Sequence, residues 1–398
     1  MAFNANRCQQ ILLELLAIPC PCGFTDEVVH YIANHLKHVG VKYDITRRGT
    51  IRAKLPGGSD ASQRQARAIV AHTDTIGAMV SRIKPSGRLA LVPIGYWSSR
   101  FAEGVRVNVF SEKGAFRGTV LPVLDWGVTR DSGVDGVPVA WENVELRIDE
   151  LVSSSDDVRE LGIDVGDPVV LDGSPEFLSN GFIVGRHLDN KAGVALVLEL
   201  LYQLKEAGET PFEDTFVLFT ITETVGAGTG SAVLPEVSEL VTVDFASVRP
   251  ECSVMHQHIT IASADAGGPF DYHLTAHLKA LAEAEKLPHH KIVLPAFHND
   301  AASTIAAGHD VRTALLAYTG DASHSLERVH MDALANMTHL LRVYVRSAPT
   351  FTSDTELTTA EAFSHQISRV NLPPSPTPVP DMADVIQVKK VMRDDAAD

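Results

Sequence analysis

A long stretch of short β-like runs divides this chain into two parts, and this division constrains the fold more than any other feature. From Gly77 to about Phe177 the apolar runs are short and are separated by Gly, Pro and Asp, as in "GVRVNVF" and "GAFRGTVLPVL". Strands at this spacing, with turn residues between them, predict a small barrel or sandwich. The segments on either side alternate strand-like and helix-like patterns, which is typical of an α/β domain. We therefore expect an α/β domain that is split by a β-rich insertion.

This pattern predicts three regions with defined limits. Residues 1–76 and 180–347 form the α/β domain, and residues 77–179 form the inserted β-rich domain. Exposed strand edges need a partner or a cover, so we expect the insertion to carry a subunit interface. Residues 348–398 form a flexible tail, because "NLPPSPTPVPD" is rich in proline and the end of the chain is charged and polar.

Composition excludes several classes of function. The net charge of −16 argues against binding to nucleic acid and to anionic membranes. The longest apolar runs, such as "GVALVLELL", are far shorter than the ~20 residues that span a bilayer. The N-terminus lacks the pattern of a signal peptide, and the four cysteines have no metal-ligand or redox spacing. These features predict a reduced, cytoplasmic protein.

Polar side chains follow apolar strands at five places. In an open α/β sheet, ligands gather at the carboxyl ends of the strands, so these side chains are expected to converge in one crevice. The residues are His72 and Asp74 after "AIVAH", Asp189 in "GRHLDNKAG", Glu223 at the end of "FVLFTITE", Asp244 in "LVTVDFAS" and His324 in "GDASHS".

Two histidines and several carboxylates are the residues that a dinuclear metal hydrolase needs. Zinc, cobalt or manganese accepts imidazole nitrogen and carboxylate oxygen, two ions require a bridging carboxylate, and a further carboxylate takes a proton from water. Taken singly, each residue has a simpler interpretation: a lone "HTD" is usually a loop, and Asp189 is equally suited to cap the helix that follows it. Only the ordered set favours a metal site.

The motifs together resemble a known family. "AHTDTIGAMV", "GRHLDNKAGVALVLELL", "ITETVGAGTG", "VTVDFAS" and "GDASHSLERVHMDAL" resemble the glutamyl and deblocking aminopeptidases of metallopeptidase family 42, over about residues 8–346. The resemblance implies a zinc-peptidase-like mixed sheet flanked by helices, with an inserted β-barrel-like dimerisation domain. It also implies a metal-dependent aminopeptidase that removes N-terminal residues from short peptides through a metal-bound water. The metal would be zinc, cobalt or manganese, and the protein a homo-oligomer built from dimers, up to a dodecamer.

The resemblance also assigns roles to the candidate residues. His72 and Asp244 hold one ion, His324 holds the other, and Asp189 bridges both. Glu223 is the general base, and Asp74 orients the imidazole of His72.

One position departs from the family pattern. The family usually has two glutamates at this strand end, a base and then a metal ligand, whereas this chain has Glu223 and Thr224. A neutral hydroxyl is a poor ligand for a divalent ion, so we expect one firmly bound ion and a weak second site.

Two alternatives and a finer resemblance complete the sequence-based interpretation. The chain could instead be an amidohydrolase or deacylase that acts on a small blocked dipeptide, or a metal-depleted relative without catalysis.

"ITIASADAGGPFDYHLT" and "FHNDAASTIAAGHDVRTALL" resemble a subgroup of the family encoded with synthesis of the osmolyte N-acetylglutaminylglutamine amide. In the second segment Asp300 is a candidate substrate or ligand-supporting residue, although a loop or cap role fits it equally well.

Overall fold

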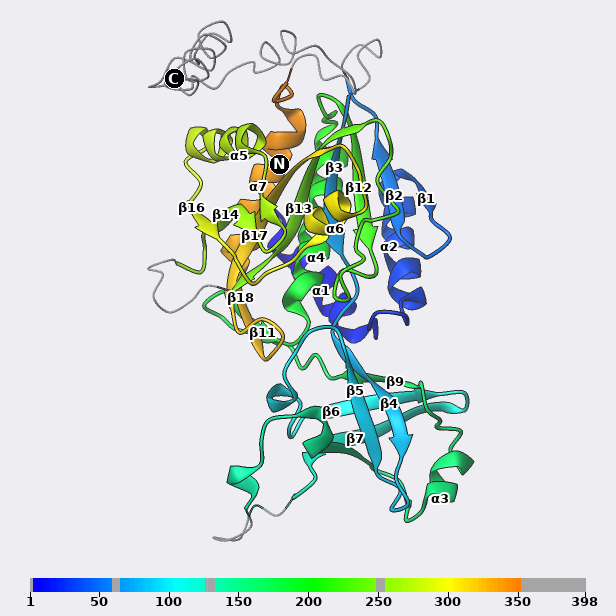
Figure 1. The fold of residues 1–398 in the computed structure, drawn as a ribbon. Helices are drawn as coiled ribbons and strands as arrows, with labels where there is room; N and C mark the ends of the chain where they lie inside the picture. Colours follow the sequence, from blue (N-terminus) through cyan, green and yellow to red (C-terminus); the bar gives the residue numbers. More distant parts are fainter. Residues whose placement is uncertain (1–2, 59–64, 126, 128–132, 248–254, 352–398) are drawn as a thin grey trace, which may run out of the picture.

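The structure is a computed structural model that describes residues 3–58, 65–125, 127, 133–247 and 255–351. Figure 1 shows an α/β unit built around a large sheet, with a smaller β unit below it. This is the predicted fold class: a mixed sheet flanked by helices, with an inserted β-barrel.

The large sheet has twelve strands in the part of the chain that the structure describes. Nine form a continuous path in the order β1-β2-β12-β3-β13-β17-β18-β11-β10, and β14, β15 and β16 branch from it through β17. The strands are β1 (Lys42–Ile45), β2 (Ile51–Leu55), β3 (Ala66–His72), β10 (Glu176–Phe177), β11 (Phe182–Gly185), β12 (Asp214–Thr220), β13 (Val237–Ser247), β14 (Ile259–Asp265), β15 (Gly268–Pro269), β16 (His289–Val293), β17 (Arg312–Asp321) and β18 (Glu327–His330).

The centre of this sheet is parallel and covered on both faces. Strands β12, β3, β13 and β17 run side by side in the same direction, so their carboxyl ends meet at one edge. All seven residues of β3 are buried. Alternate side chains of β3 enter different cores: Ile69 and Ala71 pack on one face, and Ala68 and Val70 on the other.

Within the described ranges, seven α-helices accompany the strands. They are α1 (Ala5–Ala17), α2 (Asp26–Val39), α3 (Ser155–Glu160), α4 (Leu188–Ala207), α5 (Tyr272–Ala284), α6 (Asp300–Ala306) and α7 (Met331–Arg346). Apolar residues of α1, α2, α4, α5 and α7 share one core with the sheet, whereas α6 contributes to the core on the opposite face. Helix α4 lies behind the centre of the sheet, where it contacts β3 and β13 (Figure 1).

The inserted unit is a closed six-stranded barrel with the order β4-β5-β8-β7-β6-β9. Its strands are β4 (Gly77–Ile83), β5 (Leu89–Ile94), β6 (Arg106–Ser111), β7 (Gly114–Pro122), β8 (Val144–Ile148) and β9 (Pro168–Leu171). Its interior is filled by apolar side chains such as Val107, Val109 and Leu146. Because a closed barrel pairs its own edges, free strand edges give no argument here for a subunit partner.

The chain after α7 begins with residues that contact the α/β unit. The guanidinium of Arg67 donates to the backbone carbonyls of Ser347 and Ala348, and Phe351 is buried beneath the guanidinium of Arg312. The rest of the predicted tail, residues 352–398, lies outside the described residues. Within the described part of the chain, no helix has the length and apolar character needed to cross a membrane.

Candidate metal centre

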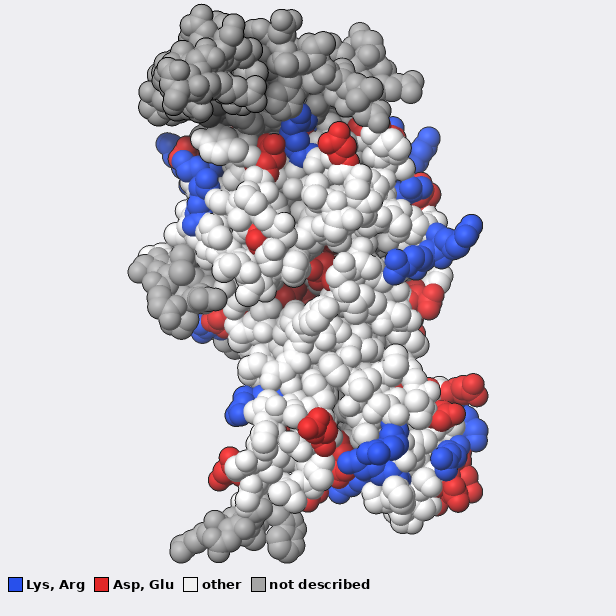
Figure 2. Space-filling view, in the orientation of Figure 1, with Lys and Arg blue, Asp and Glu red and all other residues white. Residues whose placement is uncertain are grey.

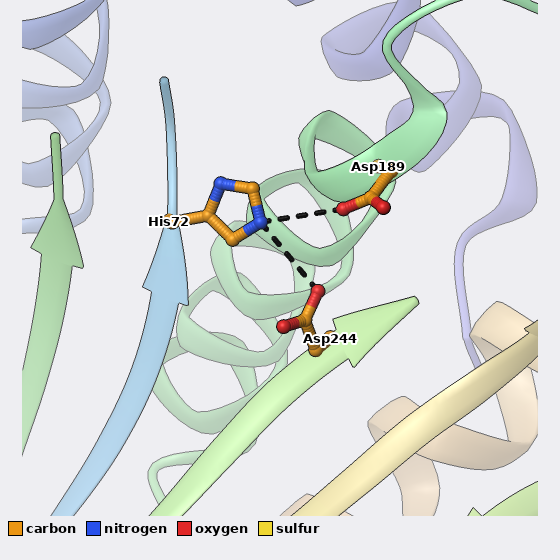
Figure 3. Close-up of side chains that lie close together, drawn as sticks. All are labelled: His72, Asp189 and Asp244. Carbon is orange, nitrogen blue, oxygen red and sulfur yellow. Dashed lines mark ion pairs between the residues drawn. The ribbon is translucent and has the colours of Figure 1, made fainter. Parts of the chain in front are cut away.

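Three predicted metal ligands converge where the parallel strands end. His72 is the last residue of β3, Asp244 lies in the neighbouring β13, and Asp189 comes from the first turn of α4 (Figure 3). The backbone of Asp189 is not helical, and the chain kinks here before the regular part of α4 begins. The carboxylate oxygens of Asp189 lie against His72, His324 and Ser323.

One imidazole nitrogen lies at the centre of this group. His72 Nε2 is 3.3 Å from Asp189 Oδ1 and 3.5 Å from Asp244 Oδ1, and all three side chains are buried. A carboxylate oxygen of Glu223, which follows β12, lies 3.5 Å from the same nitrogen. Among the described residues, His72, Asp189 and Asp244 form the one group of three or more side chains whose ligand atoms lie close enough together to hold a metal ion.

Asp74 supports this arrangement in two ways. Its backbone carbonyl lies 3.0 Å from His72 Nδ1, closer than its carboxylate at 3.7 Å. A carbonyl only accepts, so Nδ1 carries the proton and Nε2 keeps a lone pair for an ion. The carboxylate of Asp74 accepts from the backbone N–H groups of Glu223 and Thr224, at 3.1 and 3.0 Å. Asp74 therefore orients His72 chiefly through its main chain and fixes the turn after β12 through its side chain.

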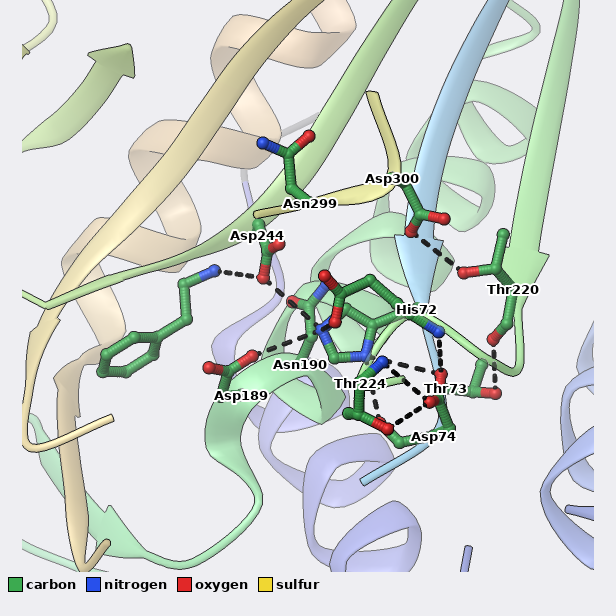
Figure 4. Close-up of polar contacts among 12 residues, drawn as sticks. His72, Thr73, Asp74, Asp189, Asn190, Thr220, Thr224, Asp244, Asn299 and Asp300 are labelled. Carbon is green, nitrogen blue, oxygen red and sulfur yellow. Dashed lines mark hydrogen bonds and ion pairs between the residues drawn. The ribbon is translucent and has the colours of Figure 1, made fainter. Parts of the chain in front are cut away.

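Thr224 contacts Asp74 rather than an open ligand position. Its hydroxyl donates to Asp74 Oδ2 at 2.6 Å, and the side chain is buried (Figure 4). The hydroxyl is thus satisfied inside the protein, and it offers no charged oxygen to an ion.

His324 lies beside the other oxygen of Asp189. Its Nε2 is 3.7 Å from Asp189 Oδ2, so the two oxygens of Asp189 face two different histidines. His324 Nδ1 donates to the backbone carbonyl of Tyr96 at 2.7 Å. Tyr96 follows β5, so a loop of the barrel orients this histidine of the α/β unit.

Sequence reasoning missed Glu327, which holds two ligand-bearing segments in place. This buried carboxylate accepts from the backbone N–H of Asp189 at 2.9 Å and from that of His324 at 3.0 Å. Burial raises its pKa well above the usual range. The available signal was its position three residues after His324 in "SHSLE".

Burial and mutual charge shift the pKa values of the ionisable groups in this cluster. Burial raises the pKa of Asp244 to about 6 and the pKa of Glu223 well above its usual value. For His72 burial favours the neutral form, but the surrounding carboxylates outweigh it and raise its pKa. For Asp189 burial is likewise outweighed, by the hydrogen bond and charge of His72 and by the charge of His324, so its pKa falls. Several carboxylates around one imidazole form a site that a divalent cation would neutralise.

Asp300, the first residue of α6, is a further buried carboxylate close to the cluster around His72. One oxygen accepts from the hydroxyl of Thr220 at 3.0 Å, and the other is buried with no hydrogen-bond partner among the residues that the structure describes. Burial raises its pKa to about 7. Asn299, and not Asp300, caps helix α6.

Comparisons with known proteins agree with this architecture. The model of the M42 glutamyl aminopeptidase family matches residues 49–340. YhfE of Bacillus subtilis (strain 168), named as a candidate aminopeptidase, is 36% identical over 347 residues, which cover 86% of this chain and 99% of YhfE. The glutamyl aminopeptidase of Lactococcus lactis subsp. cremoris (strain MG1363) is 27% identical over 47% of this chain and 52% of its own length.

A solved structure has the same fold. The TET1 peptidase of Pyrococcus horikoshii, described as assembling into a tetrahedron or a large octahedral shell, superimposes with a TM-score of 0.74 at 21% identity and covers 86% of this chain and 100% of its own. Because the family model matches most of the chain and YhfE matches over nearly its whole length, this chain belongs to the M42 family of peptidases, enzymes that hydrolyse peptide bonds.

Proposed function

We propose that this protein is a metal-dependent aminopeptidase that removes N-terminal residues from short peptides. The observation that carries the proposal is the convergence of His72, Asp189 and Asp244 on one point, with Glu223 beside them. The aminopeptidase names of its relatives support the direction of cleavage, from the N-terminus of the substrate.

The residues present suit one divalent ion. Imidazole nitrogen from His72 and carboxylate oxygens from Asp189 and Asp244 are ligands that zinc, cobalt and manganese accept. Such an ion supplies a Lewis acid and an activated water. With an ion held there, Glu223 would be the residue that accepts a proton from the attacking water and passes it to the leaving amine, since its carboxylate lies 3.5 Å from His72 Nε2 and burial raises its pKa well above the usual value. Asp74 keeps the imidazole of His72 in the tautomer that this role requires.

A second ion has fewer ligands. Asp189 Oδ2 and His324 Nε2 lie 3.7 Å apart on this side, and Thr224 donates its hydroxyl to Asp74. The proposal therefore assigns one firmly bound ion to each chain, with a second that exchanges readily.

The described surface around the site favours substrates whose first residue is uncharged. Figure 2 shows recessed acidic side chains in a face that is otherwise mostly white, with Lys and Arg gathered away from them. Three apolar residues next to site residues are exposed: Tyr96 at 81%, Leu326 at 50% and Val225 at 43%. The acids suit the substrate's α-ammonium, and the apolar rim suits an apolar side chain.

Assembly and location complete the proposal. The shared fold with a peptidase described as a shell-forming assembly supports a homo-oligomer, built from dimers and extending to a dodecamer. A monomer in light scattering at micromolar concentration would contradict it. The described cysteines Cys8, Cys20 and Cys22 are all free, which supports a reducing, cytoplasmic location.

The test joins elemental analysis to a substrate panel on one preparation. Leucyl, lysyl and glutamyl anilides and one N-blocked dipeptide are assayed after chelation and again after zinc or cobalt is restored. We expect hydrolysis of the leucyl anilide that is lost on chelation and recovered with metal. Cleavage of the blocked dipeptide alone would favour a deacylase, and no cleavage with any metal would favour a non-catalytic relative.

A further inference from the structure

The turn that carries Glu223 is held from two sides, and the second side has no role in the function proposed above. On the first side, the carboxylate of Asp74 accepts from the backbone N–H groups of Glu223 and Thr224. On the second side lies helix α6, which begins at Asp300. The side chain of Asp300 is only 3% exposed. Burial of a carboxylate costs free energy, so a carboxylate buried beside this turn needs a reason.

Asp300 contacts the start of the turn through Thr220. Thr220 is the last residue of β12 and is fully buried. Its hydroxyl donates to Asp300 Oδ2 at 3.0 Å (Figure 4). Its backbone carbonyl accepts from the N–H and from the hydroxyl of Thr73, both at 2.8 Å. Asp300 therefore fixes the point at which β12 ends, shortly before Glu223.

The other oxygen of Asp300 packs against the end of the turn at Gly228. A Cβ at this position would overlap Asp300 Oδ1 and the hydroxyl oxygen of Ser303, so only glycine lets α6 come this close. The backbone N–H groups of Ala227 and Gly228 both donate to the carbonyl of Thr222 at 3.0 Å, so the turn closes on itself here. The carboxylate of Asp300 thus rests against both ends of the turn.

The main chain of Asp300 makes separate bonds that anchor α6. Its backbone carbonyl accepts from the hydroxyl groups of Thr229 and Thr304, each at 2.8 Å, and both threonines are fully buried. A substitution of the Asp300 side chain leaves these bonds in place. Such a substitution therefore tests the contacts with Thr220 and Gly228 rather than the anchoring of the helix.

Glu223 lies between these two contacts in the chain, and its carboxylate is 3.5 Å from His72 Nε2. A displacement of about 1 Å in a catalytic group can lower the rate by about 100-fold. We propose that Asp300 is a positioning residue for the general base: its two carboxylate oxygens fix both ends of the turn and so determine where the carboxylate of Glu223 lies. This inference rests on the role proposed for Glu223.

The first test changes the partner of Asp300 at the start of the turn. Thr220→Val removes the hydroxyl and keeps the branched shape of the side chain, whereas Thr220→Ser keeps the hydroxyl. At matched metal occupancy, Thr220→Val should lower kcat for the leucyl anilide by about tenfold or more and change KM by less than about twofold. Thr220→Ser should keep at least about half of the wild-type kcat. Equal kcat values in the two variants would overturn the proposal.

The second test uses two glycines of the same turn. Gly226 and Gly228 have φ values of +82° and +35°, so alanine is strained at either position. A Cβ at Gly226 meets nothing within 4 Å, whereas one at Gly228 would overlap Asp300. Gly228→Ala should therefore lower kcat about tenfold more than Gly226→Ala. Crystal structures should show the carboxylate of Glu223 displaced from His72 in Gly228→Ala alone. An undisplaced carboxylate there would contradict the second contact.

A double-mutant cycle shows whether Asp300 acts through Glu223. Asp300→Ala should lower kcat of the otherwise wild-type protein by about 10–100-fold, but should change the residual rate of Glu223→Gln by less than about twofold. If Asp300→Ala does not fold, Thr220→Val takes its place in the cycle. An equal fall in both backgrounds would refute the proposal, because Asp300 would then act on the whole site.

The same cycle separates this inference from the function on which it rests. Wild-type activity in Glu223→Gln would refute the general base and this inference together. Loss of rate in Glu223→Gln without a loss in Asp300→Ala would refute this inference alone and leave the base in place.

Discussion

At the scale of single residues, the site depends on which atom of each side chain is already engaged. His72 and His324 each give Nδ1 to a backbone carbonyl, of Asp74 and of Tyr96, and each turns Nε2 towards Asp189. Thr224 uses its hydroxyl on Asp74. The candidate ligands are therefore unequal on the two sides of Asp189, and this inequality leads to the first two predictions.

Glu223→Gln tests the proposed base. The amide keeps the size of the side chain and its place beside His72 but cannot accept the proton. Metal content and melting temperature should stay close to wild type, while hydrolysis of the leucyl anilide falls by roughly 10²–10⁴, the usual scale for loss of a general base. Steady-state kinetics at matched metal occupancy measure this, and a rate above about a third of wild type would remove Glu223 from the role.

Thr224→Glu tests the second ion site. A glutamate here can place a carboxylate near Asp189 and His324, so the second ion should bind more tightly, with two ions retained after gel filtration in metal-free buffer instead of one. Thr224→Val is the control, because it removes the hydroxyl bond to Asp74 without adding a ligand. Elemental analysis decides: two ions held by the wild-type chain would mean that another residue supplies the missing ligand.

At the scale of elements, the loop after β5 connects the barrel to the candidate metal centre. Tyr96 accepts from His324, and Trp97 donates its indole N–H to the carbonyl of Gly77 and packs its ring edge-to-face on Trp141. Gly95 adopts φ = +82°, and a Cβ there would come within 3.3 Å of the carbonyl of Thr224. The loop therefore fits closely against the turn after β12 and depends on glycine at this position.

Gly95→Ala should weaken the binding of the second ion, because this loop orients His324. The added methyl group crowds Thr224 and moves the carbonyl of Tyr96 away from His324, so affinity for the second ion should fall by about tenfold, the effect expected from losing an orienting partner. Gly104→Ala is the matched control, because Gly104 has a similar φ of +78° but nothing within 4 Å of a Cβ. Both variants should lose about 1 kcal/mol of folding stability to backbone strain. Equal ion affinity in the two, measured by competition with a chelator, would show that the loop does not position His324.

At the scale of the whole molecule, the segment after α7 packs against the α/β unit and bonds to its buried Arg67. Arg67 is fully buried, pairs with Glu239 at 3.0 Å and donates to the carbonyls of Tyr344, Ser347 and Ala348. Thr350 donates its backbone N–H to Glu239. The first residues after the helix thus satisfy a buried ion pair that would otherwise lack acceptors and donors.

Two truncations separate these contacts from the rest of the tail. Ending the chain after Phe351 should leave the melting temperature within about 1 °C of wild type, because the proline-rich sequence beyond it can bury little apolar surface. Ending the chain after Arg346 should lower the free energy of unfolding by about 3 kcal/mol or more. This truncation removes the buried side chain of Phe351 and two backbone carbonyls that accept from Arg67. Calorimetry of the two proteins measures the difference. Equal melting temperatures would show that residues 347–351 stabilise nothing.

Much of this architecture could be predicted from the sequence, because it depends on local patterns. An uninterrupted apolar run predicts the buried strand that ends at His72. Glycines predict the turn after Glu223, and short apolar runs separated by turn residues predict the strands from Gly77 onwards. The family motifs occur in the expected order, and from them the fold class seen in the structure was predicted correctly.

Other features were decided only by tertiary structure, because they depend on contacts between segments far apart in the chain. The closure of the barrel follows from the pairing of β9 with β4 and β6, which no local pattern encodes. Glu327 acts by accepting from the backbone of Asp189, and Tyr96 by accepting from His324 across 228 positions. One partner in each contact is a main-chain group, which every residue carries, so the sequence does not show which distant segment Glu327 or His324 will contact.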